Sequence, residues 1–172
     1  MENLPGGHTI PRLARRTGSV LVMISLRTID DANRGAVEAL RTTPAQEQFV
    51  SGVTDSLLEA AEEPGAHAEY WAIYDDETPV GFVMIADEVE GPEYIAHYLW
   101  KLLIDERYQR RGYGSATLDL VVALFRARGV NELWTSAGQG DGSPLAFYER
   151  YGFTQAGEIV FDDEVLLHLT FD

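Results

Sequence analysis

The sequence predicts a single α/β (α+β) domain whose strands and helices follow the order βααβββαβαββ. A short apolar run at residues 102–104 leads through a glycine-containing loop into residues 113–128, where apolar side chains recur at helical spacing. Aromatic and β-branched runs at residues 70–74 and 80–86 flank a polar turn and predict an antiparallel hairpin. With 172 residues and 45% hydrophobic content, the chain is long enough to bury one core.

Residues 1–19 do not fit this domain, because prolines, glycines and arginines dominate them. We expect either a disordered extension or a start codon placed too early, so that the domain comprises residues 20–172. Partial alternation over residues 20–28 predicts the first strand. Met23, at this strand, would be a natural first residue.

Two helices are expected next. Asp30 or Asp31 can cap a helix that runs to Leu40. Pro44 suits the first turn of a second helix, which should end near residues 64–65. The apolar face of that helix would hold Phe49, Val53, Leu57 and Ala60 or Ala61.

The second half of the chain continues the alternation of strands and helices. Gly129 is a plausible C-cap for the helix at residues 113–128. Ser143 and Pro144 suit the start of a short helix that ends at Gly152. The expected strands are residues 98–104, 132–136, 153–161 and 164–171.

The composition and charge of the chain limit the classes of function and partner that it can have. With 24% charged residues and no apolar run of membrane-spanning length, the chain reads as a soluble protein. The absence of cysteine excludes disulfides and thiolate chemistry, and is compatible with the cytoplasmic location we expect. The formal net charge is −15, and residues 42–100 hold thirteen Asp and Glu but no lysine or arginine. Such a field disfavours nucleic acid and anionic membranes as partners; it either favours cationic small molecules or serves solubility alone.

A strand, a glycine loop and a helix N-terminus form a geometry suited to phosphate. The first helical N–H groups have no intrahelical partner and lie at the positive end of the helix dipole. Gly112 and Gly114 keep the backbone accessible, and Arg110 and Arg111 add charges that match phosphate oxygens. The loop lacks the lysine of a P-loop and, at Thr117, the third glycine of a dinucleotide fingerprint.

The segment 109–114, Gln-Arg-Arg-Gly-Tyr-Gly, resembles the Gln/Arg-x-x-Gly-x-Gly/Ala pyrophosphate loop of the GNAT family of acyl-CoA-dependent N-acyltransferases. The run 146–153, Ala-Phe-Tyr-Glu-Arg-Tyr-Gly-Phe, strengthens the match; the alternative is an ordinary strand-to-helix turn. The resemblance covers roughly residues 24–171. It implies the GNAT fold, a mixed, mostly antiparallel sheet with helices on both faces, and acetyl-CoA as cosubstrate without a metal.

The resemblance also implies the cofactor-binding residues. In that family the strand before the loop splays from its neighbour and offers backbone groups to the pantetheine arm, while loop amides bind the pyrophosphate. Asp141 or Ser143 lies where the family often contacts the cofactor arm, although loop capping explains either residue equally well. The implied set is Leu102, Leu103, Ile104, Gln109, Arg110, Arg111, Gly112, Tyr113, Gly114, Ser115, Asp141 and Ser143.

Tyr148 is the implied catalytic residue. An amine that attacks a thioester expels a thiolate, and a phenol near the sulfur can give it a proton. The family carries this acid in the short helix that follows the polar loop, which matches Tyr148 here. The alternative is a core tyrosine whose hydroxyl is bound to backbone. Tyr151 is expected to be structural.

The sequence does not identify a general base. Some polyamine-acetylating members carry a carboxylate at the position of Trp100, so that role does not transfer. Trp100, Tyr98 and Tyr70 are candidates to flank an aliphatic cation. The candidate bases acting through water are Glu69, Glu88, Glu93 and His97, of which His97 also suits a structural role.

Within the family, the chain is most similar to bacterial diamine/spermidine acetyltransferases, through residues 98–105, 108–109, 112–114 and 142–148. This predicts direct transfer of an acetyl group to a primary amine, with a small cation such as a polyamine as the expected acceptor. The alternatives are an antibiotic amine, an amino acid or a protein N-terminus as acceptor, or a non-catalytic acyl-CoA-binding module. Dimers are common in the family, so a homodimer is compatible with this reading.

Overall fold

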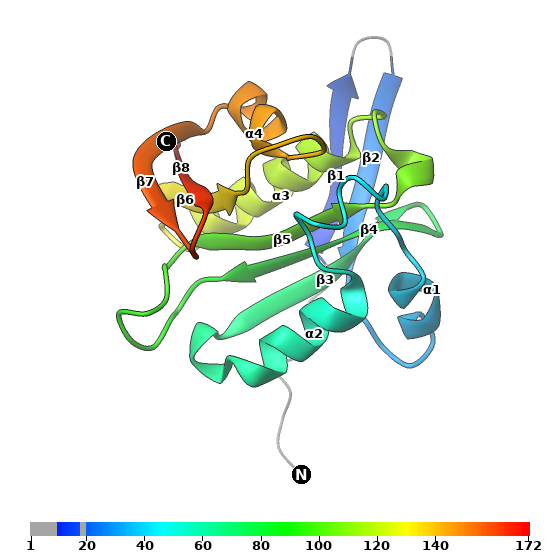
Figure 1. Ribbon diagram of the computed structural model, residues 1–172. Coiled ribbons are helices and arrows are strands. Elements are labelled where there is room, and N and C mark those ends of the chain that lie inside the picture. Colours follow the sequence, from blue (N-terminus) through cyan, green and yellow to red (C-terminus); the bar gives the residue numbers. More distant parts are fainter. Residues whose placement is uncertain (1–9, 18–19) are drawn as a thin grey trace.

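The computed structural model describes residues 10–17 and 20–172, and residues 1–9 and 18–19 lie outside the described part. Eight strands of the described residues form one sheet in the order β1-β2-β3-β4-β5-β6-β8-β7 (Figure 1). Neighbouring strands are antiparallel except β5 and β6. The strands are β1 (Ile10–Thr17), β2 (Val20–Arg27), β3 (Ala68–Asp75), β4 (Thr78–Ala86), β5 (Tyr98–Ile104), β6 (Glu132–Ala137), β7 (Thr154–Val160) and β8 (Glu164–Thr170).

Helices cover both faces of the sheet (Figure 1). Because successive strand residues point to opposite faces, Phe82 and Met84 of β4 pack with α1 and α2, whereas Val83 and Ile85 pack with α3 and α4. The predicted mixed, mostly antiparallel sheet with helices on both faces is confirmed. No described helix is long and apolar enough to cross a membrane. The helices are α1 (Arg34–Glu38), α2 (Val53–Glu62), α3 (Tyr113–Ala127) and α4 (Leu145–Tyr151), with 3-10 turns η1 (Pro64–Ala66) and η2 (Glu106–Tyr108).

Residues 10–17 form β1, where the sequence predicted an extension outside the domain. Met23 pairs with Ala14 of β1, so the suggested first residue lies inside a paired strand. Leu13 packs against the core, and Arg15 donates to the Asp119 carboxylate of α3 at 2.7 and 2.8 Å. An edge strand with one solvated face needs few apolar residues, which is why its composition resembled that of an extension. The same expectation for residues 1–9 and 18–19 falls outside the described residues.

The segment after Pro44 also differs from its prediction. Residues 44–49 form turns, and the side-chain oxygen of Gln46 accepts a hydrogen bond from the Thr43 amide (3.1 Å). The helix begins only at Val53, after Gly52 in extended conformation, because glycine disfavours a helix interior. Phe49 therefore lies in a turn and is not part of the helical face that the sequence predicted.

Most other predicted elements lie within a few residues of the observed ones. Asp30 Oδ1 accepts hydrogen bonds from the Ala32 and Asn33 amides (2.9 and 3.1 Å) in the turn that precedes α1, which ends before the predicted Leu40. Gly129 follows α3 with φ +78°, the left-handed conformation of a C-cap glycine. The observed order has one strand more than predicted, β1.

Candidate active site

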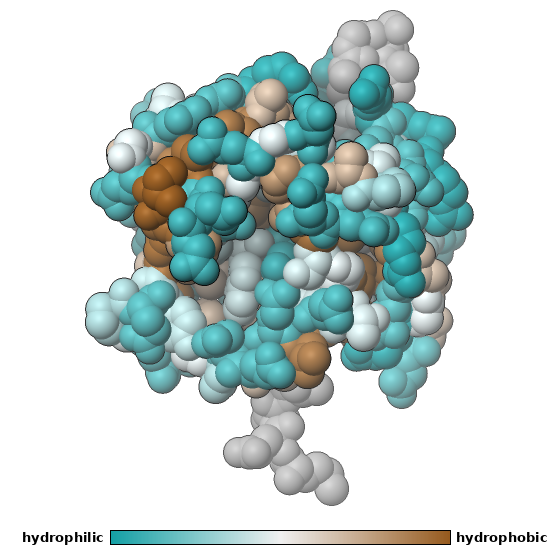
Figure 2. Space-filling model, viewed as in Figure 1, coloured by the Kyte–Doolittle hydropathy of each residue, from teal (hydrophilic) through white to brown (hydrophobic). Residues whose placement is uncertain are grey.

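A cleft of about 1120 Å³ opens beside β5. Within the described residues, β5 pairs with β6 only at Tyr98 and Trp134, where the Trp134 amide donates to the His97 carbonyl (2.8 Å). Thr135 adds a side-chain bond to the Leu99 carbonyl (3.0 Å). Beyond these bonds the strands are unpaired and the cleft begins; Figure 2 shows a hollow near the centre of the face. The splayed strand implied by the resemblance is therefore present.

The backbone of β5 presents alternate residues to the cleft. The Asp105 amide donates to Val80 of β4 (2.9 Å), and a Cβ placed on Gly81 would lie 2.3 Å from the Leu103 carbonyl oxygen, so residues 103 and 105 face β4. The backbone N–H and C=O groups of successive strand residues point to opposite neighbours. Leu102 and Ile104 therefore turn their backbone groups away from β4, and both line the cleft. Leu103, named with them from the sequence, does not line it, since its side chain is buried on the α1–α2 face.

The α3 N-terminus forms a cradle free of side chains. The first hydrogen bond of the helix joins the Ala116 amide to the Gly112 carbonyl (3.0 Å), so the amides of residues 113–115 precede the helical ladder. Gly112 has φ +88°, a conformation that glycine adopts without strain. A Cβ on Gly114 would lie 3.0 Å from the Phe147 ring, so a larger residue there would require the ring to shift by a few tenths of an ångström.

The predicted loop residues have different surroundings. Arg110, Gly112, Tyr113, Gly114 and Ser115 line the cleft. Arg111 is exposed and lies outside the lining, with its guanidinium 5.7 Å from the Tyr108 ring centre.

Gln109 lines the cleft, but its side chain is already engaged. Its amide nitrogen donates to the Ile104 carbonyl (2.9 Å) and to the Gln46 side chain (2.7 Å). Gln109 thus ties the end of β5 to the turns at residues 44–49.

The two loop candidates near α4 also differ. Ser143 lines the cleft, accepts a hydrogen bond from the Leu145 amide (3.1 Å) and donates to the Gly138 carbonyl. Ser143 thus joins the first residue of α4 to the loop that follows β6. Asp141 is exposed and does not line the cleft, and its backbone carbonyl accepts a bond from Gln48 (3.4 Å).

Tyr148 lies in the cleft wall and is only 5% exposed. Its ring packs between those of Phe147 and Phe153, with centroids at 5.3 and 5.5 Å. Burial raises the pKa of Tyr148 well above its ordinary value; a hydrogen bond with Thr135 offsets part of that rise, and the Glu164 charge adds to it. The phenol is therefore protonated at neutral pH and able to donate.

Tyr151 is held by other bonds. Its hydroxyl donates to Asp119 (2.7 Å), the residue that also binds Arg15. Burial and this hydrogen bond raise the pKa of Tyr151. The tyrosine links α4 to α3, in keeping with its expected structural role.

The half of the cleft near Tyr98 is aromatic and acidic. Its rings are Tyr94, Tyr98, Trp100 and Phe161, and its carboxylates are Glu63, Glu93 and Glu164. Trp100 is the extra residue of a β-bulge, since Met84 pairs with Lys101 and Ile85 with Leu99. The bulge aims Trp100 into the cleft. Tyr70, suggested as a third ring, is outside the lining and stacks on Phe82 (6.2 Å).

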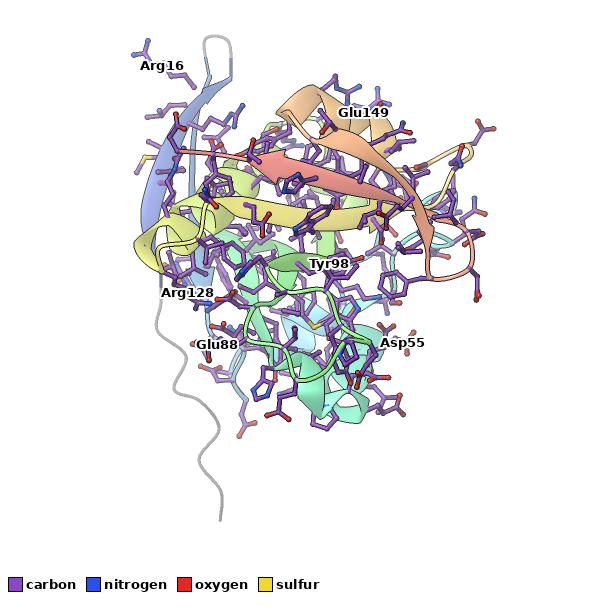
Figure 3. All side chains as sticks on the ribbon, turned by 90° about the vertical axis from the view of Figure 1, so that its left-hand side faces the viewer. Arg16, Asp55, Glu88, Tyr98, Arg128 and Glu149 are labelled. Atoms are coloured by element: carbon purple, nitrogen blue, oxygen red, sulfur yellow. The ribbon has the colours of Figure 1, made fainter. Side chains whose placement is uncertain are left out.

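Of the candidate bases, only Glu93 lines the cleft. Glu69 pairs with Arg128 (2.8 Å) and His97 with Asp87 (2.7 Å), both away from it. Glu88 is exposed on the loop after β4, apart from Tyr98 (Figure 3).

Sequence reasoning missed several lining residues. Arg15 reaches the cleft from β1 and donates to the Ser115 carbonyl at the start of α3 (3.3 Å). Glu63, Ser136 and Glu164 come from segments far apart in the chain. No local motif marks them, because the register of β6 with β8 brings Ser136 to Glu164, and Glu63 arrives from the end of α2.

Comparison with known proteins agrees with this geometry. The model of the acetyltransferase (GNAT) family matches residues 41–153. The chain is 27% identical over 148 residues to spermine/spermidine N(1)-acetyltransferase of Bacillus subtilis (strain 168), which covers 84% of this chain and 96% of that protein. It is 34% identical over 58 residues to the ribosomal protein bS18-alanine N-acetyltransferase of Escherichia coli (strain K12), over 34% of this chain and 39% of the relative.

Solved structures share the fold. The Salmonella typhimurium acetyl transferase that modifies the N-terminal serine of ribosomal protein L7/L12 matches with a TM-score of 0.67 at 16% identity, over 96% of this chain and 100% of that one. The PaiA N-acetyltransferase from Thermoplasma acidophilum, in complex with coenzyme A, matches with a TM-score of 0.52 at 16% identity, over 69% and 72% of the two chains. Since the family model matches well over half of this chain, the protein belongs to the acetyltransferase (GNAT) family.

Proposed function

We propose that this protein transfers the acetyl group of acetyl-CoA to a primary amine of a small cation such as a polyamine, in the cytoplasm. One observation supports this most: β5 runs along a single cleft whose two ends differ in charge. Near Ile104 lie the free amides of α3 with Arg15, Arg110 and Arg150, and near Tyr98 lie aromatic rings and three carboxylates. An anionic cofactor suits the first end and a cationic acceptor the second.

The residues present fit coenzyme A. Bound acetyl-CoA supplies an acetyl group activated as a thioester. The amides of residues 113–115 and the cations Arg15 and Arg110 are placed to hold pyrophosphate oxygens. The outward carbonyl group of Leu102 is available to bond the pantetheine arm as an added strand would.

Two groups of the chain are assigned to the transfer itself. The Leu102 amide, turned away from β4, donates to the carbonyl oxygen and stabilises the negative charge that develops there. Tyr148 gives its proton to the departing sulfur, which a phenol of raised pKa can do because it stays protonated. Attack is direct, and no residue of the chain is acylated.

The acceptor class follows from the acidic end. Tyr94, Trp100 and Phe161 offer ring faces to an aliphatic cation, and Glu63 and Glu93 offer carboxylates. Lys101 also lines the cleft, but Glu59 neutralises it at 2.9 Å. The similarity to the Bacillus subtilis spermine/spermidine N(1)-acetyltransferase supports the same acceptor.

A panel of amines tests the proposal. Purified protein is mixed with acetyl-CoA and, separately, with spermidine, a diamine, an aminoglycoside, a free amino acid and an alanyl peptide, and released thiol is measured. We expect the highest kcat/KM with spermidine or the diamine.

Two other outcomes would each indicate a different function for the protein. Preference for the alanyl peptide would make it a protein N-terminal acetyltransferase, the reading that similarity to the bS18-alanine enzyme favours. Coenzyme A binding without release of thiol from any amine would make it a binding module.

A further inference from the structure

Three side chains form a hydrogen-bonded chain from the cleft to β8. The Tyr98 hydroxyl of β5 is bonded to Ser136 of β6, and the Ser136 hydroxyl donates to Glu164 Oε2 of β8 at 2.5 Å. All three residues line the cleft, and Figure 3 shows Tyr98 where β5 meets β6. A serine hydroxyl carries one proton, so Ser136 gives its proton to Glu164 and accepts that of Tyr98. The Tyr98 oxygen keeps a lone pair for a donor in the cleft.

Neither phenol in this region is a base at neutral pH. Burial raises the pKa of Tyr98; the hydrogen bond with Ser136 offsets part of the rise, and the charges of Glu164 and Tyr148 add to it. The pKa of Tyr148 is also raised, again chiefly by burial. Both hydroxyls therefore pass or donate protons, and a carboxylate has to be the final acceptor.

Glu164 is the carboxylate placed for this. Glu63 accepts a hydrogen bond from the Tyr94 hydroxyl (2.7 Å) and is exposed, and Glu93 is exposed on the β4–β5 loop. Only Glu164, among the three lining acids, is joined to a phenol that lies beside Tyr148. Phe161 packs edge-on against the Tyr98 ring, with the ring centroids 6.1 Å apart.

We propose that Glu164 is the terminal proton acceptor of the reaction, reached from the acceptor amine through Tyr98 and Ser136. The inference rests on the proposed acetyl transfer to an amine. Tyr98 is the catalytic residue that touches the nitrogen, whereas Ser136 and Glu164 act through it. The acceptor nitrogen thus lies between Tyr98 and the thioester carbonyl, with Tyr148 beside the sulfur.

The proton count balances. The ammonium gives one proton to the Tyr98 oxygen while the Tyr98 proton moves to Ser136 and the Ser136 proton to Glu164, which becomes neutral and later releases it to solvent. The neutral nitrogen then attacks the carbonyl carbon, and the carbon–sulfur bond breaks. Tyr148 protonates the sulfur and regains a proton from the acylated nitrogen. The nitrogen loses two protons in total, one to solvent and one to the thiol.

The test is the pH profile of kcat/KM for the amine that the wild type acetylates best. Variants Glu164→Gln and Ser136→Ala are assayed from about pH 6 to about pH 10, a range that spans the ionisation of an alkyl amine near 10.4. We expect a loss of roughly 1,000-fold at neutral pH, shrinking about tenfold per pH unit toward the pKa of the amine, because only the already neutral amine reacts without the acceptor. Ser136→Thr, which keeps the hydroxyl, should restore activity.

Controls separate this role from others. Asp163→Asn removes the same charge from an exposed site one residue before Glu164 and should match the wild type. The titratable groups facing Glu164 are Tyr98 from β5 and Tyr148 from α4, and Glu63 and Glu93 share the cleft. A pH-independent loss, no loss, or a change in acceptor KM alone would overturn the proton path. Absence of turnover with every amine in the wild type would instead overturn the proposed function and this inference together.

Discussion

At the scale of single residues, the surroundings of Tyr148 support a role as the proton donor to the leaving thiolate. It is buried, packed between two aromatic rings, and part of the cleft wall. Burial that raises a phenol's pKa also keeps its proton available for a departing thiolate. The alternative of a core tyrosine bonded to backbone is less favoured, because Tyr148 lines the cleft.

Tyr148→Phe should lower kcat by roughly 10- to 100-fold, since it removes a proton donor and little volume. Coenzyme A affinity, measured by calorimetry, should stay near the wild-type value. Tyr151→Phe is the matched control: it removes the bond to Asp119 (2.7 Å) and should lower the free energy of unfolding by about 1 kcal/mol while kcat stays close to wild type. Equal losses of binding and turnover in Tyr148→Phe would mark a structural residue.

At the scale of elements, β1 is a strand that its amino-acid composition did not predict. Its arginines suggested a tail, yet Arg15 bridges β1 to Asp119 and to the first turn of α3. Arg15 and Asp119 are both about one-third exposed, so the pair alone contributes little. The larger effect is the pairing of β1 with β2, which gives β2 a neighbour on that side.

Removal of residues 1–19 should therefore lower the thermal midpoint by several degrees. For a domain of this size, such a shift corresponds to a loss of about 1–2 kcal/mol in the free energy of unfolding. It should also promote self-association, because β2 becomes an open edge that carries the exposed Leu21 and Met23. Differential scanning calorimetry and light scattering measure the two effects. Removal of residues 1–9 alone keeps β1 and is the control. A chain of residues 20–172 that is as stable and monodisperse as the full chain would place β1 outside the domain.

The elements also show what a sequence can predict. β5, α3 and the Gly129 cap were found because local periodicity and cap chemistry define them within about fifteen residues. The glycine loop at residues 109–114 was recognised because its glycines serve a local backbone need, and its role in binding the cofactor stays a prediction. Glu164 and Ser136 were missed because their meeting with Tyr98 depends on the registers of β6 with β8 and of β5 with β6, between residues 28 and 38 positions apart.

At the scale of the whole molecule, charge is unevenly distributed. The chain carries −15 overall, yet the cleft combines arginines near the α3 N-terminus with carboxylates near Tyr98. A bound cofactor would bring further negative charge to the cleft. The two together should draw a polycation toward the acidic end, and the attraction should grow with the number of charges on the acceptor.

Ionic strength tests this directly. Raising salt from about 0.01 M to about 0.15 M shortens the screening length from about 30 Å to about 8 Å, so KM for spermidine should rise several-fold while kcat changes little. A monoamine of similar length carries one charge and should show a much smaller rise. Sodium chloride and potassium chloride should act alike, since the effect is screening rather than competition by one ion. If the monoamine and spermidine respond equally, the net charge of −15 serves solubility alone, and the choice of acceptor rests on the lining of the cleft.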